Sequence, residues 1–196
     1  MSSINSESLS NETASLQAAQ LLDRLMRLSR NGVGLEGLNP AQWEALRYID
    51  RANRFSRTPA GLSTYLGSTR GTVSQTLISL EQKGFVSRQA SPRDKRSIRL
   101  ELTDAGAGAL ARDPLLEVAN DISSVVGGDA CALVDTLRLI LRATIVRNGS
   151  RAFGACHTCK FFQSNAEGGG PHYCGLLDEP LTARDSVAIC IEQVDA

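Results

Sequence analysis

Residues 58–84 hold two short helical segments separated by a tight turn, and this pattern restricts the fold more than any other feature of the chain. The first segment begins at Thr58-Pro59, a capping residue followed by a proline suited to the first helical turn. The second begins at about Thr69 and ends at Gly84, which suits the left-handed position after a helix. Joined by "LGST", the two segments predict a helix-turn-helix.

Two strand-like segments follow the second helix directly. The stretch "FVSRQAS" suits a strand, and "SIRLELT" alternates Ile98, Leu100 and Leu102 with other residues in a period of two. The basic, turn-forming stretch "PRDKR" lies between them. A strand, a basic loop and a second strand after a helix-turn-helix predict a β-wing.

Amphipathic helices are predicted on both sides of this unit. Residues 15–30 place leucines at helical spacing, and a further helix opens at Asn39-Pro40. After the wing the chain returns to helix at about residue 103, bends near Pro114 and ends in a helix over about residues 129–147. Apolar side chains expected in the core are Trp43, Leu46, Ile49, Val73, Leu77 and Leu80.

Residues 69–106 resemble the winged helix-turn-helix of the MarR transcriptional regulators. The similarity rests on a Thr-Val-Ser opening of the second helix, a Leu-Glu-x-Lys-Gly ending, and a wing with Asp-x-Arg before Leu-x-Leu-Thr-x-x-Gly. The matching wing positions are Asp94, Arg96, Leu100, Leu102, Thr103 and Gly106. The resemblance implies a homodimer on a double-stranded DNA operator, with the first and last helices of residues 15–147 forming the dimer.

The resemblance also assigns the DNA-binding residues. The second short helix would enter the major groove with Ser68, Thr69, Arg70, Thr72, Ser74 and Gln75 near the base edges. In the wing, Arg93, Lys95 and Arg96 would reach phosphates or the minor groove, and Asp94 would orient Arg96. The charge distribution agrees, since residues 40–104 hold eleven Lys and Arg against six Asp and Glu, a net +5.

Four of the five cysteines lie in the last part of the chain, with the spacing Cys156-x2-Cys159-x14-Cys174-x15-Cys190. No segment is apolar and long enough to predict a membrane span, and the polar N-terminus lacks a signal core, so a cytoplasmic protein is expected. In that reducing compartment clustered cysteines favour metal binding or redox chemistry over stable disulfides. One close pair and two separated singles favour a cluster over a zinc ribbon.

The stretch 156–190 resembles the cluster-binding part of high-potential iron–sulfur proteins. Shared features are a Cys-x2-Cys opening followed by aromatic residues, a Gly-rich loop, a Cys-x-Leu step at Cys174 and a last cysteine near the C-terminus. The resemblance implies an iron–sulfur cluster (4Fe-4S) on Cys156, Cys159, Cys174 and Cys190. The tail lacks the preceding portion that completes the apolar jacket in those proteins, so a high potential is not carried over.

Other interpretations of the tail remain open. Structural zinc is the first alternative, with His157 or His172 able to replace a cysteine, and a thiol–disulfide switch through Cys156 and Cys159 is the second. The fifth cysteine, Cys131, is expected to be a small buried residue of the last core helix. No grouping of side chains suggests catalysis, so an enzyme is not expected.

The predicted fold class is mainly α with a small β-wing, plus a small irregular Cys-rich module. Four regions follow: a disordered lead over 1–14, the winged helix-turn-helix and dimerisation helices over 15–147, a linker over 148–155 and the metal-binding tail over 156–196. The function predicted is redox-responsive, sequence-specific transcription regulation. The alternatives are a regulator that senses a small-molecule effector, with the tail a zinc staple, and a tail that serves electron transfer or partner docking.

Overall fold

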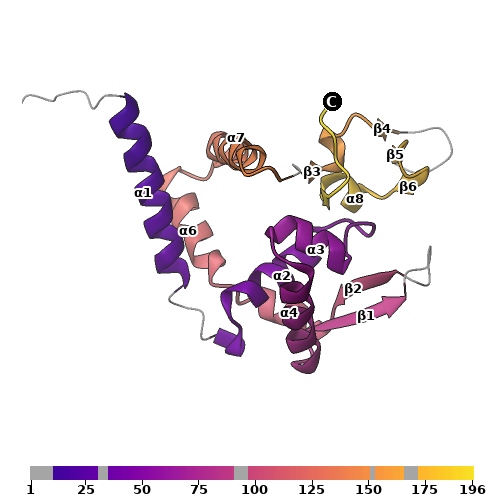
Figure 1. Cartoon of the computed structure of the whole chain (residues 1–196). Helices are drawn as coiled ribbons and strands as arrows, with labels where there is room; N and C mark the ends of the chain where they lie inside the picture. Colours follow the sequence, from indigo (N-terminus) through magenta and orange to yellow (C-terminus); the bar gives the residue numbers. More distant parts are fainter. Residues whose placement is uncertain (1–10, 31–34, 91–96, 151–152, 166–171) are drawn as a thin grey trace, which may run out of the picture.

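The helix-turn-helix and the wing form one lobe. The computed structural model describes residues 11–30, 35–90, 97–150, 153–165 and 172–196. The lobe contains the short helix η1 (Leu35–Gly37), the helices α2 (Pro40–Arg51), α3 (Pro59–Leu66), α4 (Arg70–Gln82) and α5 (Asp104–Leu110), and the strands β1 (Val86–Ala90) and β2 (Ile98–Leu102). They gather in the lower right of Figure 1.

The local signals that begin and end these helices are confirmed. Asn39 caps α2 in a reciprocal capping box with Gln42, and the Thr58 side chain accepts a hydrogen bond from the backbone N–H of Gly61 at the start of α3. Thr69 caps α4, and Gly84 follows that helix with a φ of 77°. Because each cap satisfies backbone groups within a few residues, the sequence alone locates these ends.

One apolar core holds the lobe together, and the predicted core positions in it are confirmed. Trp43, Leu77 and Leu80 are almost fully buried. The other large buried apolar side chains are Leu38, Leu46, Tyr48, Ile49, Leu62, Val73 and Leu100. In the wing, β1 and β2 pair antiparallel with Val86 opposite Leu102, which places Leu100 on the core side. The wing tip, residues 91–96, lies outside the described residues.

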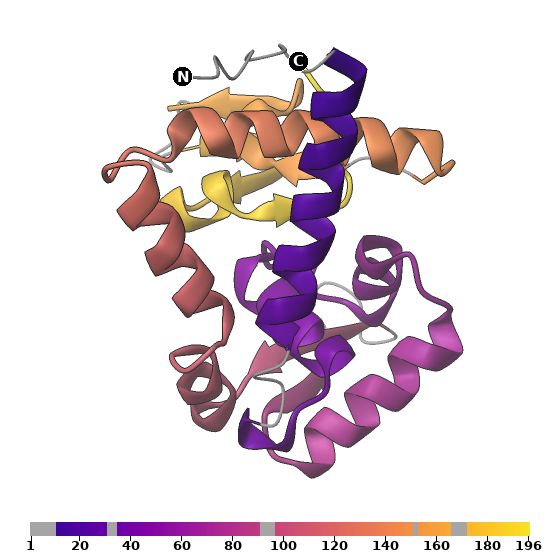
Figure 2. The same cartoon turned by 90° about the vertical axis from the view of Figure 1, so that its left-hand side faces the viewer.

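Three further helices stand beside the lobe: α1 (Asn11–Arg30), α6 (Leu115–Val125) and α7 (Cys131–Arg147). The predicted bend near Pro114 is the break between α5 and α6. None of the three helices buries a described side chain. Helices α1 and α6 stand on the same side of the lobe, at the left of Figure 1, and Figure 2 shows the same helices from that side. Helix α1 also begins earlier than the predicted residue 15, at Asn11, while residues 1–10 of the predicted lead lie outside the described residues.

The tail is more regular than the predicted irregular module. It contains β3 (Gly154–Ala155), η2 (Cys156–Thr158), β4 (Phe162–Ser164), β5 (His172–Cys174), β6 (Glu179–Leu181), α8 (Ala183–Val187) and β7 (Ile189–Cys190). Strands β4, β5 and β6 form an antiparallel sheet, and β3 pairs with β7, so the end of the predicted linker belongs to the tail. The tail lies beside α7 and above the α3 end of the lobe in Figure 1. None of the described helices is long and apolar enough to cross a membrane.

The prediction for Cys131 is wrong, because this residue is exposed in the structure. It is the first residue of α7, and its backbone N–H donates to the Asp129 carboxylate at 2.9 Å. The apolar composition around it suggested burial, but the local start of the helix places it at the surface.

A partly buried ion pair joins the lobe to the start of α6 and gives a testable pH dependence. Arg47 of α2 donates two hydrogen bonds of 2.6 Å to Asp113, whose carboxylate also accepts from the Leu115 N–H. Burial alone would raise the pKa of Asp113, but these hydrogen bonds outweigh it and the pKa is lowered. We expect Asp113→Asn to lower the free energy of unfolding by about 1–3 kcal/mol near neutral pH.

Urea denaturation of both proteins checks this value. Since the folded pKa lies below the unfolded one, the stabilisation is present above about pH 4 and is lost as the pH falls below it. The difference between wild type and variant should therefore shrink in acid. Asp50→Asn is the control, because Asp50 forms a long, exposed ion pair with Arg184 at 3.4 Å and its loss should cost under about 1 kcal/mol. An equal effect of both substitutions would contradict the assignment.

Candidate functional site

Helix α4 presents a polar outer face over a buried apolar one. Val73, Leu77 and Leu80 point into the core, which fixes the rotation of the helix about its axis. The exposed side chains of its first two turns are those of Arg70, Thr72, Ser74 and Gln75. No described carboxylate pairs with Arg70, so its guanidinium is available to an external acceptor.

The other predicted DNA-binding residues fare differently. The Thr69 hydroxyl is engaged in capping, accepting from the Thr72 N–H and lying 2.9 Å from the Thr72 hydroxyl. Ser68 is half-buried, and its carbonyl accepts from the Ser63 hydroxyl at 2.6 Å. The wing residues Arg93, Asp94, Lys95 and Arg96 lie outside the described residues. Among the described residues, the exposed side-chain donors of this face without a hydrogen-bond partner are those of Arg70, Ser74 and Gln75.

The structure brings the four tail cysteines to one small pocket. Cys156 begins η2, Cys159 follows it, Cys174 ends β5 and Cys190 lies in β7. All four line the same pocket. Its remaining walls are apolar except for Glu192, and the apolar residues are Phe162, Leu176, Leu177 and Leu181. Cys156 and Cys190 are buried, while Cys159 and Cys174 are partly accessible.

Several N–H groups are directed at these sulfurs. The Val194 N–H donates to Cys159 Sγ at 3.5 Å, and the Asn53 side-chain amide donates to Cys156 Sγ at 3.3 Å. The interaction with Cys156, together with the Glu192 N–H, Asn53 and Ser56, outweighs burial and lowers the pKa of the Cys190 thiol to about 6. The same pairing and burial raise the pKa of Cys156. Of this pair, Cys190 is thus the sulfur on which the pocket stabilises negative charge.

The geometry bears on the choice of metal. Among the described residues, no three side chains of the ligating types are placed to hold a single metal ion. Neither histidine lines the cysteine pocket. His157 Nδ1 lies 3.0 Å from the Ser186 carbonyl, and the His172 ring packs on Phe162. The donor set at the pocket is therefore four sulfurs, without a histidine.

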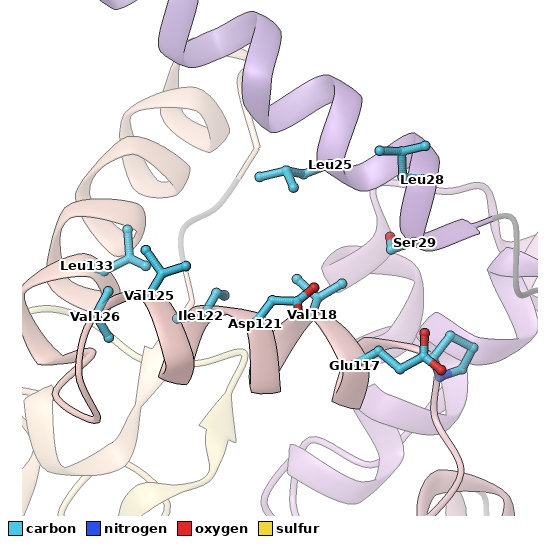
Figure 3. A pocket seen from close by; sticks show the side chains of 11 residues that line it. Leu25, Leu28, Ser29, Glu117, Val118, Asp121, Ile122, Val125, Val126 and Leu133 are labelled. Carbon is cyan, nitrogen blue, oxygen red and sulfur yellow. The ribbon is translucent and has the colours of Figure 1, made fainter.

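A second cavity of about 480 Å³ lies between α1, α6 and α7. Figure 3 shows Leu25 and Leu28 of α1 facing Val118, Ile122 and Val125 of α6. The carboxylates of Glu117 and Asp121 also line it. Its walls are otherwise mostly apolar, which suits a small organic molecule with a positive or hydrogen-bond-donating group.

The sequence analysis missed two residues at the cysteine site, Asn53 and Ser56. Both are buried polar residues of the lobe, 2% and 1% exposed, and both reach the tail across more than a hundred positions of sequence. The pattern Asn-x-x-Ser before the Thr58-Pro59 cap is a signal for a tight turn. Nothing in it indicates a sulfur partner.

Comparison with known sequences gives one family match and two curated relatives. Residues 36–97 match the MarR family. The transcriptional repressor MprA of Escherichia coli (strain K12) is 32% identical over 71 residues, which are 36% of this chain and 40% of that protein. A putative transcriptional regulatory protein for the hcr operon of Thauera aromatica is 32% identical over 77 residues, 39% of this chain and 45% of that protein. The chain thus matches less than half the length of these curated relatives.

Solved structures match over a longer part of the chain. The transcriptional repressor CouR bound to a 23-mer DNA duplex is 32% identical, with a TM-score of 0.52 over 72% of this chain and 100% of that one. CouR from Rhodococcus jostii RHA1, bound to p-coumaroyl-CoA, is 17% identical with a TM-score of 0.53 over 71% of this chain and 95% of that one. The second likeness concerns the fold alone.

Proposed function

This chain belongs to the MarR family of winged-helix transcription regulators, and we propose that it binds operator DNA as a homodimer and regulates transcription. The observation that carries the proposal is the outer face of α4, where Arg70 and Gln75 are exposed and uncommitted above a buried apolar seam. Arg pairs bidentately with guanine and Gln with adenine in the major groove. The related CouR repressor, captured on a DNA duplex, supports the same use of this lobe.

The homodimer is supported by unpartnered apolar surface on the first and last helices. Leu16, Leu21 and Leu25 of α1 are about half exposed, and Leu139 and Leu141 of α7 are exposed to a similar or greater degree. Burying such surface contributes about 25 cal/mol per Å². Leucines at these positions have a physical role when a second subunit covers them.

For the tail, we propose a 4Fe-4S cluster on Cys156, Cys159, Cys174 and Cys190. Three features support it: the four sulfurs share one pocket, N–H groups point at them, and the walls are apolar. A bound cluster would supply reversible one-electron chemistry. Among the described residues no three ligating side chains are already placed to hold a metal ion, and structural zinc on the same cysteines is the alternative to the cluster.

We further propose that the occupancy or redox state of this site changes operator affinity. The tail contacts both the lobe and α7, where Arg142 forms an ion pair with Asp195. A ligand shifts such an equilibrium by the difference in its affinity for the two states. The thiol switch through Cys156 and Cys159 and the electron-transfer or docking role of the tail remain the alternatives.

The deciding experiment is metal analysis of protein purified without oxygen, followed by DNA binding. We expect iron and sulfide at about four of each per chain, with a broad visible absorption band. Binding to a duplex selected from a random-sequence library should then differ between loaded and cluster-free protein. One zinc per chain without colour would contradict the cluster. Iron with unchanged DNA binding would favour the electron-transfer or docking role.

A second candidate signal is a small molecule in the cavity between α1, α6 and α7 (Figure 3). The carboxylates of Glu117 and Asp121 disfavour a phosphate-bearing ligand such as the CoA ester bound by the related CouR structure. They favour a cationic or donor-bearing aromatic compound. Release from DNA by such a compound in a Cys156→Ser variant would support this function and reduce the tail to a structural role.

A further inference from the structure

The turn between α2 and α3, residues 52–58, is the part of the lobe on which the cysteine site rests. At its centre, Asn53 uses both ends of its amide. The nitrogen donates to Cys156 Sγ at 3.3 Å, and the oxygen accepts from the backbone N–H of Phe55 at 3.1 Å and of Ser56 at 2.8 Å. One buried side chain therefore holds a cysteine and shapes the turn.

Ser56 holds the chain beside the next cysteine. Its hydroxyl accepts from the N–H of Ile191, the residue after Cys190, at 3.1 Å. Its carbonyl accepts from the Tyr48 hydroxyl at 2.5 Å and from the Thr58 N–H at 2.7 Å. Because Thr58 is the N-cap of α3, Ser56 connects the backbone of Ile191, next to Cys190, to the first turn of the helix-turn-helix through two hydrogen bonds.

The turn and α3 are packed too closely to leave room for an additional side-chain atom at Gly61. A Cβ atom on Gly61 would lie 2.4 Å from the Ser56 carbonyl oxygen and 2.5 Å from the Tyr48 hydroxyl, so the helix packs directly on the turn. Packed surfaces of this kind shift as a unit instead of deforming gradually. A displacement of Ser56 is therefore passed on to α3, and from α3 to α4, which packs against it.

The wing is tied to the same turn. The Arg57 guanidinium donates to the Ala52 carbonyl at 2.9 Å and pairs with Glu101 at 3.1 Å, and the Arg57 carbonyl accepts from the Leu100 N–H at 2.7 Å. Glu101 and Leu100 belong to β2. Both DNA-contacting elements of the family fold therefore rest on residues 52–58.

The tail is fixed to this turn by more than the sulfur contacts. The Asn53 N–H donates to the Ile189 carbonyl at 2.9 Å, and Ala52 forms a parallel bridge with Ile189. Arg54 forms an ion pair of 2.8 Å with Asp185 of α8 and also donates to the Pro180 carbonyl. The cysteine site thus contacts the DNA-binding lobe of its own subunit directly. It also follows α7, the proposed dimerisation helix, in sequence.

We infer that Asn53 and Ser56 complete the cysteine site from the side of the DNA-binding lobe and pass its state to α3 and the wing. This inference rests on the proposed regulation of DNA binding by the tail, but it does not depend on which metal the tail holds. Outer hydrogen bonds orient metal ligands and tune sulfur-ligated clusters. Asn53 and Ser56 therefore act as positioning residues. A change at the cysteines alters the hydrogen bonds that these two side chains make in the turn.

A double-mutant cycle on operator affinity tests the inference in the full-length protein. Cys156→Ser removes a ligand, and Asn53→Asp keeps the oxygen that shapes the turn while removing the donor to sulfur. If allosteric coupling has its usual size, Cys156→Ser changes affinity for the selected duplex by about 5- to 150-fold in the wild-type background. In the Asn53→Asp background the same substitution should change it by less than about twofold, because contacting residues give non-additive effects.

Gln42→Glu is the matched control. It makes the same amide-to-acid change in a buried residue of α2, at the end of the helix away from the tail, where the amide donates to Ser79. In this background Cys156→Ser should keep its full effect. Equal loss of the effect in both backgrounds would mean that general weakening of the lobe explains it, and would overturn the inference.

If the Asn53→Asp variant no longer binds metal, the cycle alone does not test the transmission. Hydrogen exchange tests it without that variant. Comparing wild type with Cys156→Ser, we expect faster exchange in peptides over residues 52–66 and unchanged exchange over residues 39–47 of the same lobe. Unchanged exchange over 52–66 would overturn the inference. The same result for Ser56→Ala as for Asn53→Asp in the cycle would support it.

The outcomes separate the inference from the proposed function. Iron in the wild type with an additive cycle overturns the inference and leaves the cluster in place. A non-additive cycle without iron or sulfide overturns the cluster and supports the inference. Operator affinity that is insensitive to Cys156→Ser overturns both the regulation and its transmission, whatever the metal content.

Discussion

Arg70→Ala should weaken binding to the selected duplex by about 1–3 kcal/mol for each recognition helix, because a bidentate contact to a guanine is worth that much. Arg70 is the first residue of α4, exposed and without a described carboxylate partner. By contrast, Arg88 pairs with Glu81 and Arg99 pairs with Glu101. Titration of labelled duplex with wild type and variant gives the affinity ratio.

The sequence dependence of that loss identifies the role of Arg70. If the guanidinium reads a base, the variant also loses its preference at one base pair of each half-site. If it contacts a phosphate, binding weakens equally on all sequences and the salt dependence falls by about one ion. Arg51→Ala, an exposed arginine at the C-terminal end of α2, is the control and should leave affinity within about twofold of wild type. If the Arg70→Ala variant keeps its sequence preference at every base pair of the duplex, a base-reading role is contradicted.

Helix ends and buried faces that depend on residues close in sequence could be predicted. They account for most of the lobe. The caps at Asn39, Thr58 and Thr69 each satisfy backbone groups within a single turn, so the residues alone locate the helices. The alternation of Leu100 and Leu102 likewise fixes which face of β2 meets the core. The exposed face of α4 follows once its buried face is known.

Contacts between distant segments could not be predicted in the same way. Asn53 and Cys156 are 103 positions apart, and no periodicity relates them. The cysteine spacing indicated a metal site, but its position against the lobe depends on packing of the tail strands, which were expected to be irregular. Cys131 shows the reverse error, because its apolar neighbours suggested burial while the start of α7 exposes it.

The junction between the wing and α5 gives the sharpest stability prediction, through two glycines of one helix. A Cβ atom on Gly106 would lie 2.2 Å from the Phe85 carbonyl oxygen, which itself accepts the Thr103 N–H. A Cβ on Gly108 meets nothing within 4 Å. The helix therefore approaches the backbone at the end of α4 as closely as a glycine allows.

We expect opposite results from the same substitution at these two sites. Gly106→Ala must push apart the Phe85 backbone and α5, and should lower the free energy of unfolding by about 1–3 kcal/mol or more. Gly108→Ala should raise it by about 0.5–1 kcal/mol, since alanine restricts the unfolded chain and favours helix. Urea denaturation with the linear slope compared across variants gives both values. Equal shifts in one direction would contradict the close approach. With this geometry, Gly106→Ala also weakens DNA binding, because Phe85 leads directly into β1 and so sets the position of the wing relative to α4.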